Sequence, residues 1–134
     1  MEVSFILVNY NTNALLLKAI AAIYQFTSPS LSFEVIVVDN ASKENPADLL
    51  NQAFPQVILI HAPANNGFGA ANNLAMPAAK GKYLFFLNPD AFLLSDAAHF
   101  FVQKMNDPAY RNMAFCTGEL LNEQMQPNHC FGNF

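Results

Sequence analysis

Basic residues are scarce in this sequence. Its 134 residues include six Lys plus Arg against ten Asp plus Glu, which gives a formal net charge of −4. A broad nucleic-acid surface needs clustered Lys and Arg side chains to neutralise the phosphates, and no such cluster occurs. A nucleoside diphosphate can still bind, provided that a metal ion or backbone N–H groups meet its charge.

Cysteines and long apolar runs are also few. Cys116 and Cys130 do not stand at a metal-ligand spacing, which indicates free thiols in a reducing compartment. The N-terminus has no basic segment before VSFILV, and no apolar stretch reaches the length of a membrane span. These absences predict a soluble, cytoplasmic protein.

What the chain does contain is apolar residues. They make up 53% of the sequence, thirteen of them Phe, and only 12% of the residues are charged. Such a composition excludes disorder, and the length suits one domain with a substantial core. We therefore expect residues 1–134 to form a single domain.

Apolar β-rich runs alternate with helical stripes along the chain. Strands are expected at 3–8, 33–38, 57–61, 82–87 and 113–117, and helices at 14–26, 47–54, 70–79 and from Ser95 to about residue 105. Short links between alternating strands and helices are typical of a mostly parallel sheet. The predicted fold is therefore α/β and Rossmann-like, with helices on both faces of the sheet.

The run KYLFFL at 82–87 is typical of a strand buried on both faces. Pro89 cannot donate to a sheet ladder, so the strand ends near it. Asp90 is then expected at the carboxyl end of a central parallel strand, the edge at which ligands bind in open α/β sheets. A carboxylate with the Asn88 amide beside it suits a hard divalent cation and the phosphates that the cation carries.

Two other predicted strands deliver polar residues to the same edge, namely Asn9-Tyr10-Asn11 and Asp39-Asn40. One such strand end is ordinary, because Asn and Asp also favour turns. Three at one edge favour a ligand site. A carboxylate there can accept hydrogen bonds from ribose hydroxyls or a base N–H, as acidic residues do in dinucleotide-binding folds.

The loop Asn65-Asn66-Gly67-Phe68-Gly69 precedes a predicted helix. Glycines let the backbone approach a ligand closely, and the N–H groups that open a helix favour anions. The dinucleotide fingerprint is incomplete, since Asn72 stands where a third Gly is required. Asn72 and Asn73 are poor helix formers in an Ala-rich helix, which favours a role toward a ligand over a plain polar face.

Four segments in combination resemble the N-terminal, nucleotide-binding half of a family-2 glycosyltransferase with the GT-A fold. They are VSFILVNYNT, EVIVVDNAS, FPQVILIHAPANNGFGAANNLAM and KGKYLFFLNPDA. The bacterial rhamnosyltransferase-like branch is the most similar, and the order and spacing agree from Val3 to the end of the chain. The resemblance implies an inverting transfer of a sugar from a nucleoside-diphosphate sugar to a saccharide or lipid-linked acceptor in bacterial polysaccharide biosynthesis, at the inner face of the membrane.

The resemblance also implies roles for individual residues. The nucleotide-binding residues would be Val8, Asn9, Tyr10 and Asn11 at the base pocket, Asp39 at the base or ribose, and Asn66, Gly67 and Asn72 or Asn73 completing the nucleoside site. Asn88 and Asp90 would occupy the Asp-x-Asp position, with Asp90 binding Mg²⁺ or Mn²⁺. Because Asn88 replaces one carboxylate, the cation is expected to bind weakly without the donor diphosphate.

The implied general base of the family lies in its C-terminal half. Glu119 and Glu123 are the only carboxylates after Asp107, and neither matches that base. We therefore expect a donor-binding domain without its acceptor half, and an exposed apolar patch that favours homo-oligomers at high concentration.

Alternative functions remain open from the residues alone. A non-catalytic sugar-nucleotide-binding module would use the same edge of the sheet. A receiver domain needs an acidic pair after its first strand, where Asn9-Tyr10-Asn11 stand. A sugar nucleotidyltransferase needs a Gly-rich loop bearing Arg or Lys there, which is also absent. The sequence leaves the sugar, the base and the acceptor undefined.

Overall fold

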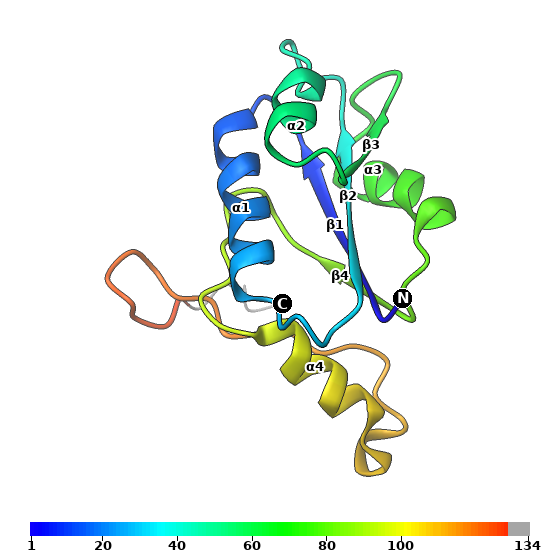
Figure 1. Cartoon of the computed structure of the whole chain (residues 1–134), viewed down its shortest axis with the longest axis vertical. Helices are drawn as coiled ribbons and strands as arrows, with labels where there is room; N and C mark the ends of the chain where they lie inside the picture. The colour runs from blue at the N-terminus through cyan, green and yellow to red at the C-terminus, as the bar shows by residue number, and fades with distance from the viewer. Residues whose placement is uncertain (129–134) are drawn as a thin grey trace.

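A four-stranded parallel sheet organises the protein, in a computed structural model that describes residues 1–128 (Figure 1). The strand order is β3-β2-β1-β4. The strands are β1 (Val3–Asn9), β2 (Phe33–Asp39), β3 (Ile58–His61) and β4 (Tyr83–Phe86). The helices are α1 (Asn13–Phe26), α2 (Ala47–Ala53), α3 (Phe68–Ala75) and α4 (Ala97–Asn106), with short 3-10 helices η1 (Met76–Ala78) and η2 (Pro108–Tyr110). The predicted α/β, Rossmann-like fold is confirmed, and all four strands of the sheet are parallel.

β1 lies at the centre of this sheet, between β2 and β4. All seven of its residues are buried, which explains its uninterrupted apolar run. Its register with β2 runs from Val3 opposite Phe33 to Asn9 opposite Asp39. The last residues of both strands therefore meet at the carboxyl edge of the sheet.

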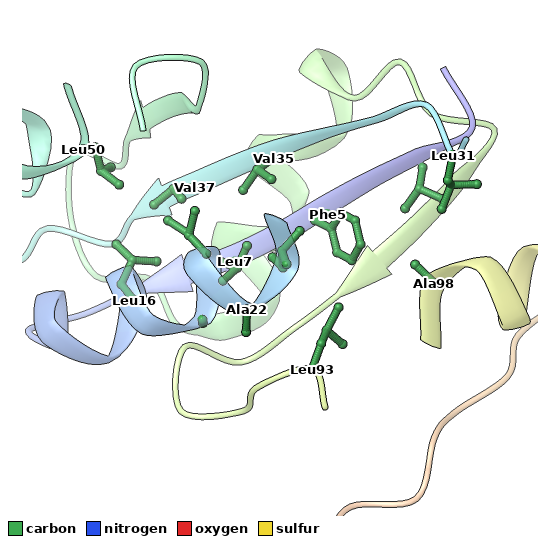
Figure 2. Close-up of a cluster of buried hydrophobic side chains, with 14 of the residues drawn as sticks. Phe5, Leu7, Leu16, Ala22, Leu31, Val35, Val37, Leu50, Leu93 and Ala98 are labelled. Atoms are coloured by element: carbon green, nitrogen blue, oxygen red, sulfur yellow. The ribbon is translucent and has the colours of Figure 1, made fainter. Parts of the chain in front are cut away.

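Successive side chains of the central strands point to opposite faces, and each face has its own helical cover. Phe5 and Leu7 point toward α1, with Val35 and Val37 of β2 beside them (Figure 2). On the other face, Ile6, Val8, Ile36 and Val38 pack in one cluster with Ala71 and Ala75 of α3. Figure 1 shows α1 and α3 on opposite sides of the sheet. Packed side chains therefore exclude water from both faces of β1 and β2. This packing holds the two strands in place, and with them the polar groups at their ends.

β4 differs from its prediction, because it is an edge strand rather than a central one. Within the described residues it pairs only with β1. Its first three residues are half-buried and Phe86 is 49% exposed. The apolar, aromatic composition of the run predicted burial on both faces, but α3 covers β1 and β2 and leaves Phe86 open. Asp90 therefore follows an edge strand in this structure.

The predicted strand at 113–117 is also wrong. From Arg111 to Asn128 the described chain has neither helix nor strand, apart from one isolated bridge between Leu121 and Pro127. The run is apolar, but a strand requires a hydrogen-bonding neighbour, and this one has none there. Instead, residues 114–118 line an apolar groove of about 570 Å³ against β4 and α4.

Helix ends show smaller differences. α3 begins at Phe68 and passes into η1 at Met76, where Pro77 occupies the first turn. Asp96 rather than Ser95 caps α4, and its carboxylate accepts a hydrogen bond from the His99 backbone N–H. A carboxylate cap also complements the helix dipole. No helix in residues 1–128 is long and apolar enough to cross a membrane.

Candidate functional site

Asn9 and Asp39 end the two central strands side by side. The Asn9 side-chain amide donates a 2.9 Å hydrogen bond to Asp39 Oδ1. The exposed fractions of the two residues are only 0% and 4%. The backbone N–H of Asn40 donates to the Asn9 carbonyl over 2.8 Å, which continues the ladder beyond the strands. The sequence expectation that these strand ends come together is thereby confirmed.

The second oxygen of Asp39 also has neighbours. Its Oδ2 accepts a 3.2 Å hydrogen bond from the Ser42 backbone N–H and lies 3.9 Å from Nδ1 of His61. The His61 side chain is half exposed at the end of β3. A carboxylate offers about four lone-pair positions, so Asp39 retains capacity to accept from a ligand.

Asn9 has its own partners on the first loop. Its amide nitrogen also lies within hydrogen-bonding distance of Asn13 Oδ1 and Ser42 Oγ, at 2.8 and 3.2 Å, so its two hydrogens are shared among three acceptors. Its carbonyl oxygen accepts from the Thr12 hydroxyl at 3.0 Å. The side chain is thus fully buried and fully bonded, and it organises the loop around Asp39. Its arrangement is that of a supporting residue.

The other predicted residues of this segment lie in different environments. Val8 is 7% exposed and packs in the core between the sheet and α3. Tyr10 is 47% exposed. Asn11 is exposed, with a left-handed φ of 58°. Tyr10 and Asn11 are therefore the members of this segment that a ligand can reach directly.

A second polar cluster joins the β2 and β3 loops. The Asn40 amide donates to Asn65 Oδ1 over 2.9 Å, and the Gly67 backbone N–H donates to the same oxygen over 3.0 Å. Gly67 has a φ of 88°, a conformation that favours glycine, and it precedes α3 directly. The loop that was predicted to meet a ligand is thus fixed to the end of β2.

Two carbonyl oxygens in this region are buried without partners among the described residues. They are Oδ1 of Asn40 and Oδ1 of Asn72, in residues that are 4% and 8% exposed. The Asn72 amide donates to the Phe68 carbonyl at 3.0 Å, which fixes its orientation. A buried acceptor without a donor costs about 1–3 kcal/mol. Such atoms are candidates for water or a ligand N–H or O–H group.

Sequence reasoning selected Asn66 from the NNG motif and missed Asn65. Asn66 and Asn73 are exposed, whereas Asn65 makes the contacts described above. The missed signal is spacing, because an Asn two residues before a turn glycine can accept from its backbone N–H. Ser42 was missed as well, although it follows Asp39 closely enough to donate to that carboxylate.

Asn88 and Asp90 form a turn directly after β4. The Ala91 backbone N–H donates to the Asn88 carbonyl over 3.0 Å, and both predicted residues are exposed. β4 is parallel to β1, so the turn lies at the same carboxyl edge as Asn9. Within residues 1–128, no three His, Cys, Asp or Glu side chains are grouped to hold a metal ion. The fit to a cation is that of one exposed carboxylate with a neighbouring amide, which would need further oxygen ligands from a bound nucleotide.

The sequence profile of Glycosyl transferase family 2 matches residues 4–119. This chain belongs to that family. The match begins at the second residue of β1 and includes the other three strands and every polar residue of the two clusters. The family-2 resemblance is thereby confirmed.

Curated relatives agree. The chain is 32% identical over 101 residues to a poly(ribitol-phosphate) beta-glucosyltransferase of Bacillus spizizenii, covering 72% of this chain and 16% of the relative. It is 27% identical over 121 residues to an uncharacterized glycosyltransferase of Haemophilus influenzae, covering 85% of this chain and 48% of the relative. The chain therefore spans less than half the length of either relative.

Solved structures match the fold. S. aureus TarS 1–349 in complex with UDP superposes with a TM-score of 0.70 at 19% identity, covering 79% of this chain and 32% of that chain. The mannosyltransferase PcManGT from Pyrobaculum calidifontis, in complex with GDP-Man and Mn²⁺, gives a TM-score of 0.72 at 25% identity, covering 80% and 33%. The α/β sheet described above is thus the GT-A arrangement of these proteins.

Proposed function

We propose that this chain is the donor-binding part of an inverting glycosyltransferase, which transfers a sugar from a nucleoside-diphosphate sugar to a saccharide or lipid-linked acceptor. The observation that carries the proposal is the buried Asn9–Asp39 pair at the carboxyl edge of the sheet, in a family-2 chain. Two solved neighbours hold nucleotides, UDP in TarS and GDP-Man with Mn²⁺ in the mannosyltransferase, and this supports a nucleotide ligand here.

In this proposal Asp39 accepts hydrogen bonds from the base or the ribose of the donor. Tyr10 and Asn11 are exposed beside it and contact the base, while Val8 and Asn9 support the pocket from within. The exposed Asn66 and Asn73 and the loop glycine Gly67 complete the nucleoside site together with Asn72. The buried, unpartnered Oδ1 of Asn72 is suited to a ligand hydroxyl.

Asp90, with Asn88 beside it, would hold Mg²⁺ or Mn²⁺ at the donor diphosphate. When bound, such an ion neutralises the charge of the departing diphosphate. A single exposed carboxylate binds a hard cation weakly, so the diphosphate must supply further oxygen ligands. Metal and nucleotide therefore bind cooperatively.

The acceptor site and the general base belong, in this proposal, to a C-terminal half that these residues do not contain. Glu119 and Glu123 are both exposed, and neither lies on a helix or strand that would aim it at the sheet edge. The proposal also includes the rhamnosyltransferase-like branch, a cytoplasmic place at the inner face of the membrane, and peripheral contact with the membrane through a lipid-linked acceptor.

A non-catalytic sugar-nucleotide-binding module is the second candidate. It is favoured by one observation, the lack of a structured carboxylate after Asp107 in the described part of the chain. Both candidates require the same nucleotide site, and turnover separates them.

A thermal-shift screen of nucleoside diphosphates, with and without Mn²⁺, tests the shared site. A ligand that binds only the native state raises the unfolding temperature by mass action. The transferase candidate further predicts hydrolysis or transfer of a donor sugar, and loss of that turnover in Asp90→Ala. Binding without turnover supports the module, and no shift with any nucleotide rejects both.

A further inference from the structure

Ser42 connects the two loops that follow β1 and β2. Its hydroxyl oxygen accepts from the Asn11 backbone N–H at 2.9 Å and from the Asn9 side-chain amide at 3.2 Å. Its own backbone N–H donates to Asp39 Oδ2 at 3.2 Å. Ser42 therefore contacts both members of the buried Asn9–Asp39 pair and also binds the backbone of the exposed residue Asn11.

The backbone on either side of these contacts is strained. Asn11 and Ala41 have left-handed φ values of 58° and 62°, which non-glycine residues adopt rarely. The Lys43 backbone N–H donates to Asn11 Oδ1 at 2.8 Å, so the two loops are linked in both directions. A strained backbone persists only where its surroundings over-determine it, and it occurs often at functional sites.

The hydroxyl proton of Ser42 has no acceptor among residues 1–128. A serine hydroxyl has two acceptor positions and one donor. The Asn11 N–H occupies one acceptor position at 2.9 Å, and the Asn9 amide, whose hydrogens also serve Asn13 and Asp39, approaches the other at 3.2 Å. Both N–H groups face the oxygen lone pairs, which directs the hydroxyl proton away from them. The side chain is partly exposed, and its residue adjoins Asp39 through the backbone contact. A donor and a carboxylate acceptor are thus held next to each other at the edge of the sheet.

From these contacts we infer that Ser42 is a nucleotide-binding residue, which holds Asp39 and Asn11 in place and donates a hydrogen bond from its hydroxyl to the bound nucleoside. The inference rests on the proposed function, since it requires a nucleotide at this edge. Ser42 fixes the Asp39 carboxylate and the Asn11 backbone before the ligand arrives. Binding then does not bear the cost of ordering two loops.

Isothermal titration of the full chain with UDP and with GDP, each with Mn²⁺, tests the inference. Ser42→Ala is expected to weaken binding of the preferred nucleotide at least about tenfold. It removes the hydrogen bond from the Ser42 hydroxyl to the ligand, and it leaves the Asp39 carboxylate less firmly positioned. Ser42→Thr keeps the hydroxyl and is expected to restore affinity to within about threefold. If Ser42 contributed to the fold alone, Ser42→Ala would lower the unfolding temperature, and nucleotide affinity would not depend on the hydroxyl group.

Ser32→Ala is the matched control. The Ser32 hydroxyl also accepts a backbone N–H, from Glu2 at 3.0 Å, but it precedes β2 and so lies at the opposite edge of the sheet. Its affinity should equal that of the wild type. Ser42→Cys, which keeps the shape but is a poor hydrogen-bonding group, provides a second variant in case the Ala form does not fold.

The outcomes distinguish the role of Ser42 from the nucleotide site as a whole. Wild-type binding with unchanged affinity in Ser42→Ala, or in Ser42→Cys, overturns the inference alone. Failure of Ser42→Thr to restore affinity does the same. A wild-type chain that binds neither nucleotide overturns the proposed function and this inference with it.

Discussion

The amide of Asn9 and the carboxylate of Asp39 are joined by a 2.9 Å hydrogen bond at the paired ends of β1 and β2. The bond is buried, and Asn9 also satisfies Thr12 and Asn13. A side chain that holds a carboxylate and a loop at once affects both folding and binding.

Asn9→Ala is accordingly expected to lower the free energy of unfolding by about 2–4 kcal/mol, because it leaves a charged acceptor and two loop groups short of partners in a buried site. Urea denaturation followed by circular dichroism measures the change. Asn73→Ala removes an exposed amide from the same edge and should stay within about 0.5 kcal/mol of the wild type. Equal stabilities for the two variants would show that the Asn9 contacts contribute nothing.

Gly81 predicts a steric effect at the other edge of the sheet. An added Cβ would overlap backbone atoms of Val3 and Ser4. Both residues belong to β1, so these atoms cannot move aside without displacing the strand. Gly81→Ala is expected to destabilise the fold by about 2 kcal/mol or more. Gly69→Ala is the control, since nothing lies within 4 Å of its added Cβ and it lies within α3. That change should be neutral or should stabilise by up to about 1 kcal/mol. Thermal unfolding of both variants decides between these outcomes.

Asp90 predicts linked binding of metal and nucleotide. Mn²⁺ titrated alone should bind weakly, and its affinity should rise at least about tenfold when UDP or GDP is present, because the diphosphate completes the oxygen ligands. Asp90→Asn should remove the effect of Mn²⁺ on nucleotide affinity. Asp48→Asn, a change in the first turn of α2, should preserve it. Equal Mn²⁺ affinities with and without nucleotide contradict the proposed metal role.

The edge of β4 predicts self-association of the chain. The Tyr83 and Leu87 N–H groups donate to the carbonyls of Glu2 and Ile6, so in a parallel ladder the backbone groups of Leu84 and Phe86 point to the open side. Phe86 is 49% exposed and Phe115 across the groove is 82% exposed. Unpaired strand edges with apolar surroundings favour pairing with another chain. Light scattering should show a mass that rises with concentration.

A charge at this edge should reduce the association. Phe86→Lys places an ammonium group on the open strand and is expected to shift the mass toward that of the monomer. Leu74→Lys, an exposed apolar position on α3, serves as the comparison and should leave the association unchanged. A strictly monomeric wild type at the highest concentration rejects the prediction.

The apolar pattern of the sequence located the four strands and the helices but added a fifth strand that does not form. The strands at 3–8, 33–38 and 57–61 and the helix at 14–26 appear within two residues of their predicted ends, because their patterns reflect burial that the structure provides. The sequence pattern of 82–87 did not distinguish an edge strand from a central one, since apolar composition reports side-chain environment and not backbone pairing. The run at 113–117 was mistaken for a strand for the same reason.

The candidate site was predictable at the level of segments. Asn9 and Asp39 were selected because polar residues followed buried strands, and the structure brings them together. The roles of Asn65 and Ser42 depend on side-chain hydrogen bonds in the loops, which composition does not reveal. Whether a predicted residue faces a ligand or supports a neighbour, as Asn9 does, depends on burial that only the folded chain defines.

The central position of β1 has a consequence for the order of assembly during folding. Val3 pairs with Phe33 and with Tyr83, thirty and eighty positions further along the chain. Closing the longer loop costs about 0.9 kcal/mol more in chain entropy than closing the shorter one. On a ribosome, the β1–β2 pair and its Asn9–Asp39 bond can therefore form while β4 is still being synthesised. The nucleotide pocket would then begin to form before the sheet is complete.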